Sequence, residues 1–316
     1  MAAAIPVVGL GTSRLLEREI LGGIEAGARH LDCARFYGNE ASVGRAIAAS
    51  GVPRPEFFIT TKVWPDWMRR VRESVEESLR DLQTSYVDLL LLHWPVAWYP
   101  NRPFSRDRTL DFARDVWPRM ADLVREGKVR ALGVSNFDQA QLSPLLGLDP
   151  PCAVNQIESH PAFHNDRLVE FCRANSILCV AWGPLGKGRV PAELEIIARS
   201  RRCSPEQVAL RWNLDRGLVV IPRSSNPRNV RSNLEADALS PLDDDERRLV
   251  QACDRGRRRF PDVVGIWPAT AHPLALALGF LLHCVASLLF YLFPLDLVAL
   301  STRRALKREL LLNTYL

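Results

Sequence analysis

Four polar residues, Asp32, Tyr37, Lys62 and His93, stand at or just beyond the ends of three successive apolar segments. Each belongs to a residue type that can transfer a proton or stabilise a charge in an active site. Alone, any one of them is more often a cap, a surface charge or a hydrogen-bonded structural group. Lys62 closes an apolar run (ITTKVW) and therefore needs a carboxylate nearby, because an unpaired buried ammonium is costly. On one face of the same fold, the four residues together predict a catalytic centre.

The segments that position these residues alternate between short apolar runs and longer helical patterns. Apolar runs without polar alternation are typical of parallel strands covered on both faces. The eight candidate strands are residues 6–11, 29–32, 57–62, 86–93, 129–134, 153–157, 177–181 and 218–221. Eight strands separated by helices predict a (β/α)8 barrel, or TIM barrel, whose active face is built by the loops after the strands. An open doubly wound sheet is the alternative, but Gly9-Leu10-Gly11-Thr12 lacks the third glycine of its dinucleotide motif.

Helices are predicted where apolar residues recur at i, i+3 and i+4, over residues 69–83, 112–126 and 205–214. Ser204 followed by Pro205 is a typical helix start, with a capping serine and a proline in the first turn. Two irregular loops follow predicted strands. Residues 95–109 contain exposed-looking aromatics, Trp98 and Tyr99, and residues 183–191 are rich in glycine. Both loops are expected on the active face.

The composition excludes several classes of function. Of the 316 residues 47% are apolar and 24% are charged, and the net charge of +5 is mild. This charge suits an anionic cofactor or a membrane surface, and no basic stripe with interleaved aromatics indicates nucleic-acid binding. The seven cysteines are odd in number and have no C-x-x-C spacing, which favours a reducing compartment over a disulfide framework or a zinc site. The N-terminus lacks the basic region of a secretory signal.

Seven motifs, in order along the chain, give a more specific indication. They are RHLDCARFYGNE, FFITTKVW, DLLLLHWPV, VRALGVSNF, VNQIESHP, AWGPLGKG and LVVIPRSSNP. Over roughly residues 7–268 the sequence resembles the aldo-keto reductase family. The resemblance implies a barrel that binds NAD(P)H in extended form and reduces small aldehydes or ketones to alcohols without a metal.

The resemblance also implies a role for each of the four polar residues. Tyr37 is expected to be the general acid that protonates the carbonyl oxygen as hydride arrives. An ordinary tyrosine, with a pKa of about 10, is a poor acid at neutral pH, so Lys62 is expected to lower the pKa of Tyr37. Asp32 is expected to orient Lys62, and His93 to hydrogen-bond the substrate oxygen.

Cofactor contacts follow from the same resemblance. Ser135, Asn136 and Gln156 match the residues that bind the nicotinamide carboxamide. Trp182 stands where many relatives stack a tyrosine on the nicotinamide ring, and it keeps an aromatic plane. The further contacts implied are those of Leu185 and of Asn233, the usual adenine contact.

The adenosine phosphate is expected to lie near Arg223 and Ser224. Arginine replaces the usual lysine there and suits bidentate phosphate contacts, so NADPH is favoured and NADH remains possible. Asn229 departs from the arginine that is frequent in the family. Arg228, one residue earlier, is a candidate to compensate, although its side chain leaves the helix in a different direction.

The family pattern makes Phe36, Trp64, Trp94 and residues 95–109 the walls of the substrate pocket, beside His93. The alternative is that these tryptophans are simply core residues. Ser13 replaces a tryptophan of many relatives and is expected to open the pocket on one side. Residues 186–191 form a shorter loop than the lid of mammalian-type relatives.

The resemblance ends at Pro268, so residues 1–268 are expected to form the barrel and 269–316 a hydrophobic tail. Residues 274–293 contain no formally charged side chain and, as a helix, reach about 30 Å, the thickness of a bilayer core. A transmembrane helix is therefore predicted, anchoring a cytosolic barrel to a lipid bilayer. The alternatives are an amphipathic helix docked on the barrel and, for function, a non-enzymatic membrane subunit that senses a cofactor through a reductase-like barrel.

Overall fold

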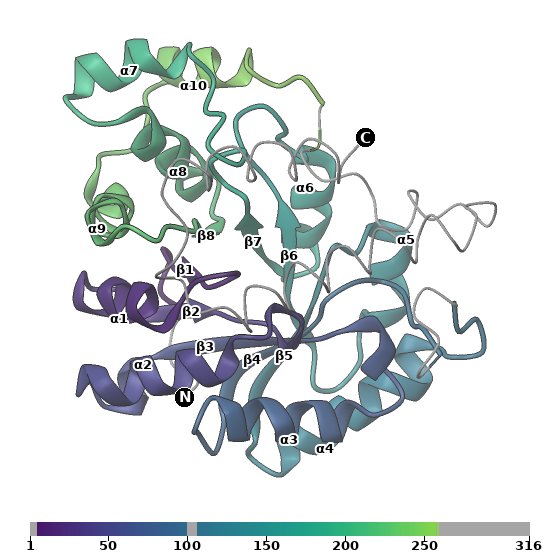
Figure 1. The fold of residues 1–316 in the computed structure, drawn as a ribbon. Helices are drawn as coiled ribbons and strands as arrows, with labels where there is room; N and C mark the ends of the chain where they lie inside the picture. Colours follow the sequence, from purple (N-terminus) through teal and green to yellow (C-terminus); the bar gives the residue numbers. More distant parts are fainter. Residues whose placement is uncertain (1–4, 100–105, 257, 259–316) are drawn as a thin grey trace, which may run out of the picture. The chain divides into compact units, whose positions relative to one another are not determined.

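The computed structural model describes residues 5–99, 106–256 and 258. Eight parallel strands form one sheet in the order in which they occur along the chain (Figure 1). They are β1 (Leu10–Gly11), β2 (His30–Asp32), β3 (Phe58–Val63), β4 (Val87–Leu92), β5 (Val129–Ser135), β6 (Cys152–Glu158), β7 (Leu178–Trp182) and β8 (Val219–Ile221). The ring is completed beside β1, where Gly9 N donates to Val220 O at 2.8 Å and Val220 N to Val7 O at 2.9 Å. The predicted (β/α)8 barrel is confirmed.

Helices follow the strands and form the outer layer (Figure 1). They are α1 (Glu17–Glu25), α2 (Glu40–Ser50), α3 (Val71–Asp81), α4 (Trp117–Arg125), α5 (Gln139–Leu142), α6 (Asp166–Ala174), α7 (Leu194–Arg201), α8 (Pro205–Asp215), α9 (Pro227–Leu234) and α10 (Asp244–Gln251). The predicted cap of α8 is present, since Ser204 Oγ accepts a hydrogen bond from Gln207 N at 3.1 Å. Two short 3-10 turns matter for the site, η1 (Arg35–Tyr37) and η3 (Pro65–Trp67), and a π-helical turn η4 (Phe112–Val116) opens α4.

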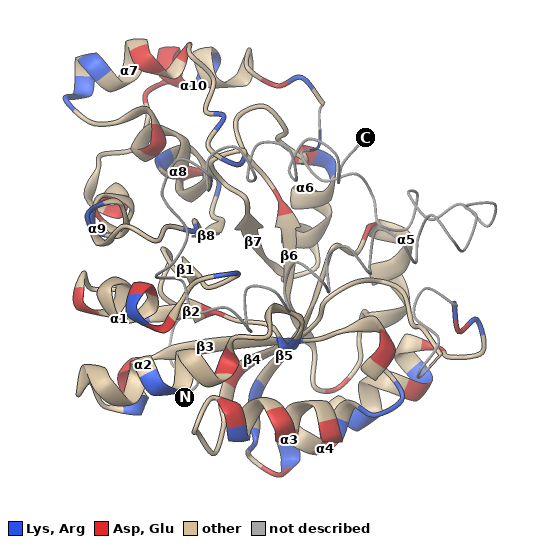
Figure 2. Ribbon diagram, in the orientation of Figure 1, with Lys and Arg blue, Asp and Glu red and all other residues tan. Residues whose placement is uncertain are grey.

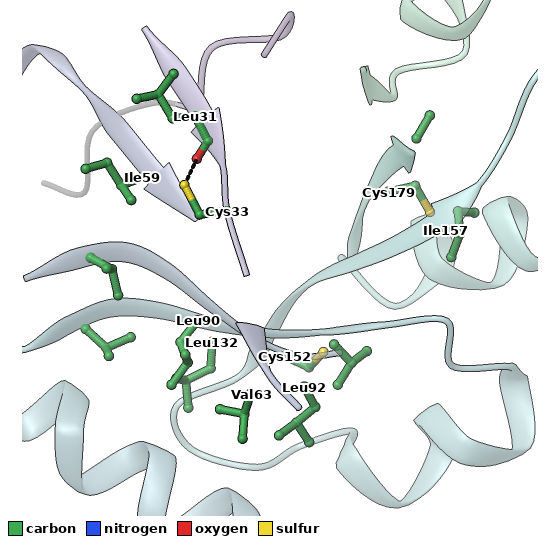
Figure 3. Close-up of a cluster of buried hydrophobic side chains, with 14 of the residues drawn as sticks. Leu31, Cys33, Ile59, Val63, Leu90, Leu92, Leu132, Cys152, Ile157 and Cys179 are labelled. Atoms are coloured by element: carbon green, nitrogen blue, oxygen red, sulfur yellow. Dashed lines mark hydrogen bonds between the residues drawn. The ribbon is translucent and has the colours of Figure 1, made fainter. Parts of the chain in front are cut away.

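Successive side chains along a strand point to opposite faces of the sheet, which separates two apolar layers. In β4, Leu89 and Leu91 belong to the cluster inside the barrel, whereas Leu90 and Leu92 belong to the cluster between strands and helices. Figure 3 shows part of the second cluster, with Leu90 beside Leu132 and Leu92 near Val63. Every residue of β4 is buried, so both faces are covered, as expected for strands with continuous apolar runs.

Charged side chains are concentrated on the helices and loops, and the strands are mostly uncharged (Figure 2). A charged residue on a strand therefore needs an explanation. On β2 and β3 these residues are Asp32 and Lys62, both buried. They lie at the carboxyl ends of their strands, the end at which barrel enzymes build their sites.

Seven of the predicted strands match the observed ones to within one residue at each end. The first differs: of residues 6–11 only Leu10–Gly11 forms a strand, partly because Pro6 has no backbone N–H to donate. Within the described residues no helix is long and apolar enough to cross a membrane. The predicted boundary at Pro268 and the predicted span at 274–293 lie outside those residues.

Candidate active site

The site is organised around the Lys62 ammonium at the carboxyl end of the barrel. Lys62 Nζ donates to Asp32 Oδ2 at 2.6 Å, to the Cys33 carbonyl at 2.7 Å and to Tyr37 Oη at 3.3 Å. Asp32 ends β2, and Tyr37 ends η1, the turn that begins three residues later. The structure therefore brings three of the four predicted catalytic side chains into direct contact. The Cys33 carbonyl was not predicted, since no side chain in the sequence marks a backbone acceptor.

The pleat of β3 explains why Lys62 points into the barrel. Phe58 belongs to the interior cluster, and Ile59 and Val63 belong to the layer between strands and helices. Lys62, an even number of residues from Phe58, shares its inward face. Only 1% of Lys62 is exposed, so the lysine depends on its hydrogen bonds rather than on water.

Burial and charge act in opposite directions on Lys62. Burial disfavours the ammonium, but the neighbouring Asp32 carboxylate and Tyr37 outweigh it, and the pKa of Lys62 is raised above its ordinary value. The group is therefore a permanent cation at neutral pH. A fixed positive charge at 3.3 Å from a hydroxyl favours the deprotonated form of that hydroxyl.

For Tyr37, burial is the larger effect. It raises the pKa of the phenol, and the Lys62 charge lowers it only in part, so the pKa lies above its ordinary value. The expectation of a net lowering is thus wrong for this form of the protein, although the direction of the Lys62 contribution is as expected. Tyr37 is accordingly a protonated donor at neutral pH, and Lys62 acts by stabilising the phenolate that remains once the proton leaves.

His93 directly follows β4 and completes the set. Its ring meets the Tyr37 ring edge-on, with 5.8 Å between centroids. Burial, and next the Lys62 charge, hold the pKa of His93 well below its ordinary value, so the imidazole is neutral at neutral pH. A neutral imidazole carries one N–H donor. Its buried Nδ1 has no hydrogen-bond partner among the described residues.

Aromatic side chains cluster around His93. Phe36 is 45% exposed and stacks on Trp64, with ring centroids 3.7 Å apart. Trp64 in turn meets the His93 ring edge-on at 4.9 Å, and the Trp94 ring lies parallel to His93 at 6.4 Å. The three predicted wall residues therefore surround the imidazole.

Trp98, from the predicted wall loop of residues 95–109, joins this aromatic wall. It was expected to be exposed, but it is buried, because its ring packs edge-on against Trp64 at 5.9 Å. Its backbone N–H also donates to the Pro65 carbonyl at 2.9 Å, which ties the start of the loop after β4 to η3. Its place among prolines in a loop concealed its burial in the sequence.

The amide set predicted to hold a nicotinamide is hydrogen-bonded to the catalytic residues. Gln156 Nε2 donates to Asp32 Oδ1 at 2.7 Å, and Asn136 Nδ2 donates to the His93 carbonyl at 3.0 Å. Asn136 Nδ2 also donates to Ser135 Oγ at 3.1 Å. Asn136 adopts a left-handed conformation with φ of 65°, which is uncommon outside glycine and is found at functional sites.

These groups fit a carboxamide ligand. Trp182 Nε1 donates to Asn136 Oδ1 at 3.0 Å, which fixes the orientation of this amide. Asn136 then offers an oxygen lone pair, whereas both hydrogens on its nitrogen are engaged. Gln156 uses one N–H on Asp32, and among the described residues its Oε1 has no partner. Donors and acceptors are thus available for both ends of a carboxamide.

The residues predicted around the adenosine phosphate lie after β8. The Arg223 guanidinium donates through Nε to the Ser13 carbonyl at 2.5 Å, and within the described chain it forms no ion pair with a carboxylate. Ser224 Oγ accepts from Asn226 N at 3.1 Å, and Asn233 is buried on α9. A guanidinium without an acidic partner is suited to an external anion.

Arg228 lies on a different side of α9 from Asn229. Arg228 lines a groove with Gly22 and Glu25 of α1, on the side of α9 that faces α1. Asn229 and Asn233 share another side of α9, because residues four apart lie above one another on a helix. In the described structure, no direct contact joins Arg223 or Ser224 to the four predicted catalytic residues.

Leu185 belongs to the loop after β7. It is half-buried and packs against the main apolar core and against the cluster formed by α7, α8 and α10. The loop turns tightly, with positive φ at Gly183, Gly186 and Gly188. Among the described residues no group of three or more His, Cys, Asp or Glu side chains could hold a metal ion.

Comparisons with known proteins agree with this geometry. The model of the Aldo/keto reductase family matches residues 20–255. The chain is similar to an aldehyde reductase of Saccharomyces cerevisiae, with 38% identity over 270 residues that cover 77% of this chain and 86% of the yeast protein. It is also similar to a methylglyoxal reductase of Salmonella typhimurium, with 37% identity over 272 residues that cover 82% of this chain and 93% of the relative.

A solved structure supports the same assignment. The aldose reductase from Schistosoma japonicum superposes with a TM-score of 0.76 and 32% identity, over 81% of this chain and 91% of the other. The family match extends over most of the barrel and includes the strands that supply Asp32, Lys62 and His93. The protein is therefore an NAD(P)H-dependent oxidoreductase and belongs to the aldo/keto reductase family.

Proposed function

We propose that the protein reduces small aldehydes or ketones to alcohols with NADPH as the hydride donor and Tyr37 as the proton donor. NADPH, when bound, supplies the hydride that reaches the carbonyl carbon. Tyr37 gives its hydroxyl proton to the carbonyl oxygen, and Lys62 stabilises the resulting phenolate. The observation that carries the proposal is the buried ammonium of Lys62, which contacts both Asp32 and the Tyr37 hydroxyl.

The remaining residues orient the reactants. Neutral His93 is the donor that aligns the substrate oxygen with Tyr37, while the Phe36–Trp64 stack and Trp94 exclude water from one side of the carbonyl. Ser135, Asn136, Gln156 and Trp182 are proposed to set the face of the nicotinamide that is presented. Names of relatives, an aldehyde reductase and a methylglyoxal reductase, favour small aldehydes as substrates.

The direct test measures NADPH oxidation by the purified protein with a panel of small aldehydes and ketones, methylglyoxal included. Turnover with at least some of them is expected. The non-enzymatic alternative predicts that NADPH binds but is not consumed with any member of the panel, and that result would reject the proposed reaction.

The preference for NADPH is proposed to depend on Arg223. Its guanidinium would pair with the 2′-phosphate, which NADH lacks. Arg223→Ala is therefore expected to weaken NADPH binding by about 1.5–3 kcal/mol, the range for a hydrogen bond to a charged group, and to leave NADH binding nearly unchanged. Dissociation constants for both cofactors, from quenching of tryptophan fluorescence, measure this difference.

Arg228→Ala is the matched control for Arg223→Ala, because Arg228 lies on the same helix-and-loop segment but lines the groove beside α1. It should change the two affinities equally, if at all. Equal losses for NADPH and NADH in Arg223→Ala itself would show that Arg223 only ties the loop at Ser13 in place.

Membrane anchoring is proposed from the sequence alone, since residues 274–293 lie outside the described structure. Their length and lack of formal charge suit a C-terminal span that leaves the barrel on the cytosolic side. After extraction with alkaline carbonate, membranes are expected to retain the full-length protein and to release a version that ends at Pro268. Full-length protein in the supernatant would contradict a span.

A further inference from the structure

The turn that carries Tyr37 meets the barrel through two ring contacts, the stack of Phe36 on Trp64 and the edge-on contact of Tyr37 with His93. Arg35 and Tyr37 are only partly buried by residue exposure, and Phe36 is 45% exposed. The hydrogen bond from Lys62 to Tyr37 is also the longest of the three that Lys62 donates. A small shift of the turn would therefore weaken this contact first, and polar interactions of the turn add to the ring contacts in resisting such a shift.

Arg35, two residues before Tyr37, supplies one such interaction. Its Nη1 donates to Asp81 Oδ2 at 2.6 Å, and its Nη2 donates to Glu77. Both carboxylates belong to α3, so one guanidinium bridges the turn to the last two turns of that helix. The Arg35 side chain is 27% exposed, which makes this pair less screened by water than most pairs on the surface.

Glu40 supplies the second interaction, from the start of α2. Its carboxylate is buried and accepts from Thr61 Oγ1 at 2.5 Å and from Ser78 Oγ at 2.8 Å. Its Oε2 also lies 3.8 Å from Arg35 Nη1. Thr61 directly precedes Lys62 on β3 and points to the opposite face, toward the helices. The same carboxylate thus contacts the strand that carries Lys62 and the turn that carries Tyr37.

The base of this network is firmly packed. A side-chain carbon added at Gly44 of α2 would lie 2.5 Å from the Asp81 carbonyl, so the backbones of α2 and α3 are in direct contact there. Because α3 is held this closely, the Asp81 carboxylate is a fixed point to which Arg35 can tie the turn.

We propose that Arg35 and Glu40 are positioning residues, which hold the Tyr37 turn against β3 and thereby keep the Tyr37 hydroxyl within reach of Lys62. The inference rests on the proposed role of Tyr37 as proton donor. The alternative is that Arg35 forms an ordinary, partly exposed ion pair, which typically contributes little to stability and nothing to a reaction. Two sets of variants separate these possibilities.

The first measurement is kcat at saturating NADPH and aldehyde. Arg35→Ala is expected to lower kcat about 10-fold, which is less than the loss of roughly 10²-fold that a displacement of about 1 Å can cause. The affinity for NADPH should not change. Arg35→Lys should recover part of the loss, since one ammonium reaches either Asp81 or Glu77. Arg72→Ala is the matched control, because Arg72 also pairs an α3 surface with a carboxylate, that of Glu126, but touches no catalytic element. It should keep wild-type kcat.

The second measurement is the dependence of kcat on pH, whose alkaline decline reports loss of the Tyr37 proton. Lys62 is the group that lowers the pKa of Tyr37, so loosening the turn should move the decline to higher pH. Removing the Arg35 charge alone would act in the same direction. The double variant Glu77→Gln/Asp81→Asn removes two negative charges, and this change of charge alone would lower the pKa of Tyr37. The same variant also releases Arg35, so positioning predicts that the alkaline decline of kcat still moves to higher pH.

Four outcomes decide between the possibilities. An upward shift with both Arg35→Ala and the double carboxylate variant supports positioning. Shifts in opposite directions, or wild-type kcat in Arg35→Ala, overturn it while the proposed reaction stands. If Tyr37→Phe in the same assay keeps wild-type turnover, the proposed reaction itself fails. If Arg35→Ala does not fold, as judged by its circular dichroism, the same criteria apply to Arg35→Lys and the double variant.

Discussion

Tyr37→Phe is expected to lower kcat by at least about 10²-fold, because the loss of a positioned proton donor removes that much from a reaction with general acid catalysis. NADPH affinity should change little, since the Tyr37 hydroxyl contacts Lys62 and, in the proposed reaction, acts on the carbonyl oxygen rather than on the cofactor phosphates. Single-turnover kinetics with an aldehyde, together with fluorescence titration of NADPH, measure the two effects separately.

Tyr86→Phe is the matched control for this experiment. The Tyr86 ring lies between the guanidinium groups of Arg54 and Arg130, at 4.1 and 3.9 Å, at the start of β4 and so at the opposite end of the barrel. Its hydroxyl is buried and has no hydrogen-bond partner in the described structure. Removing it should leave both kcat and stability close to wild type. Near wild-type turnover in Tyr37→Phe would show that another group donates the proton.

The sequence predicts the barrel well because its information is local and repeated. Each strand is a short apolar run with both faces covered, and the pattern recurs eight times. The same periodicity places Lys62 at a strand end, and the cost of burying an ammonium predicts the carboxylate that the structure supplies at Asp32. The first strand is shorter than predicted because pairing with β8 involves isolated backbone bonds rather than a regular ladder.

What the sequence could not predict depends on distances between elements. The pKa of Tyr37 is a balance between burial and the Lys62 charge, and a sequence gives the presence of the lysine but not the depth of the tyrosine. Arg35 and Glu40 look like ordinary surface charges in the printed chain. Only the folded arrangement of η1, α2, α3 and β3 shows that their partners are Glu77, Asp81 and Thr61.

The second large effect is expected from Asp32→Asn. This change leaves the buried Lys62 ammonium without its counter-charge, and removing one partner of a buried pair costs about 3–5 kcal/mol. The free energy of unfolding should fall by that amount, and the melting temperature by on the order of 10 °C. Turnover should also fall, since Lys62 then loses its own proton more readily and no longer stabilises the Tyr37 phenolate.

The dependence of this effect on pH provides its sharpest test. In the wild type the pKa of Lys62 is raised, so its stabilising contribution is complete below its ordinary value of 10.5 and is lost only as pH rises through the folded value. In Asp32→Asn, burial dominates and lowers the pKa of Lys62 below 10.5. The loss of unfolding free energy caused by the unpaired ammonium is therefore complete at low pH, and it is relieved as pH rises toward 10.5. The difference in unfolding free energy between the two proteins should therefore shrink on the alkaline side, as urea denaturation at several pH values can measure.

Asp88→Asn separates stability from chemistry in this prediction. Asp88 is buried at the start of β4 and accepts from Arg54 and Arg130, each at 2.9 Å. Its loss should also destabilise the fold, but at a temperature where the variant stays folded kcat should remain at the wild-type level, because no catalytic group touches Asp88. A difference between wild type and Asp32→Asn that stays constant with pH would mean that Asp32 does not serve as the counter-charge of Lys62. Equal losses of kcat in Asp32→Asn and Asp88→Asn would mean that the catalytic effect is only a consequence of lower stability.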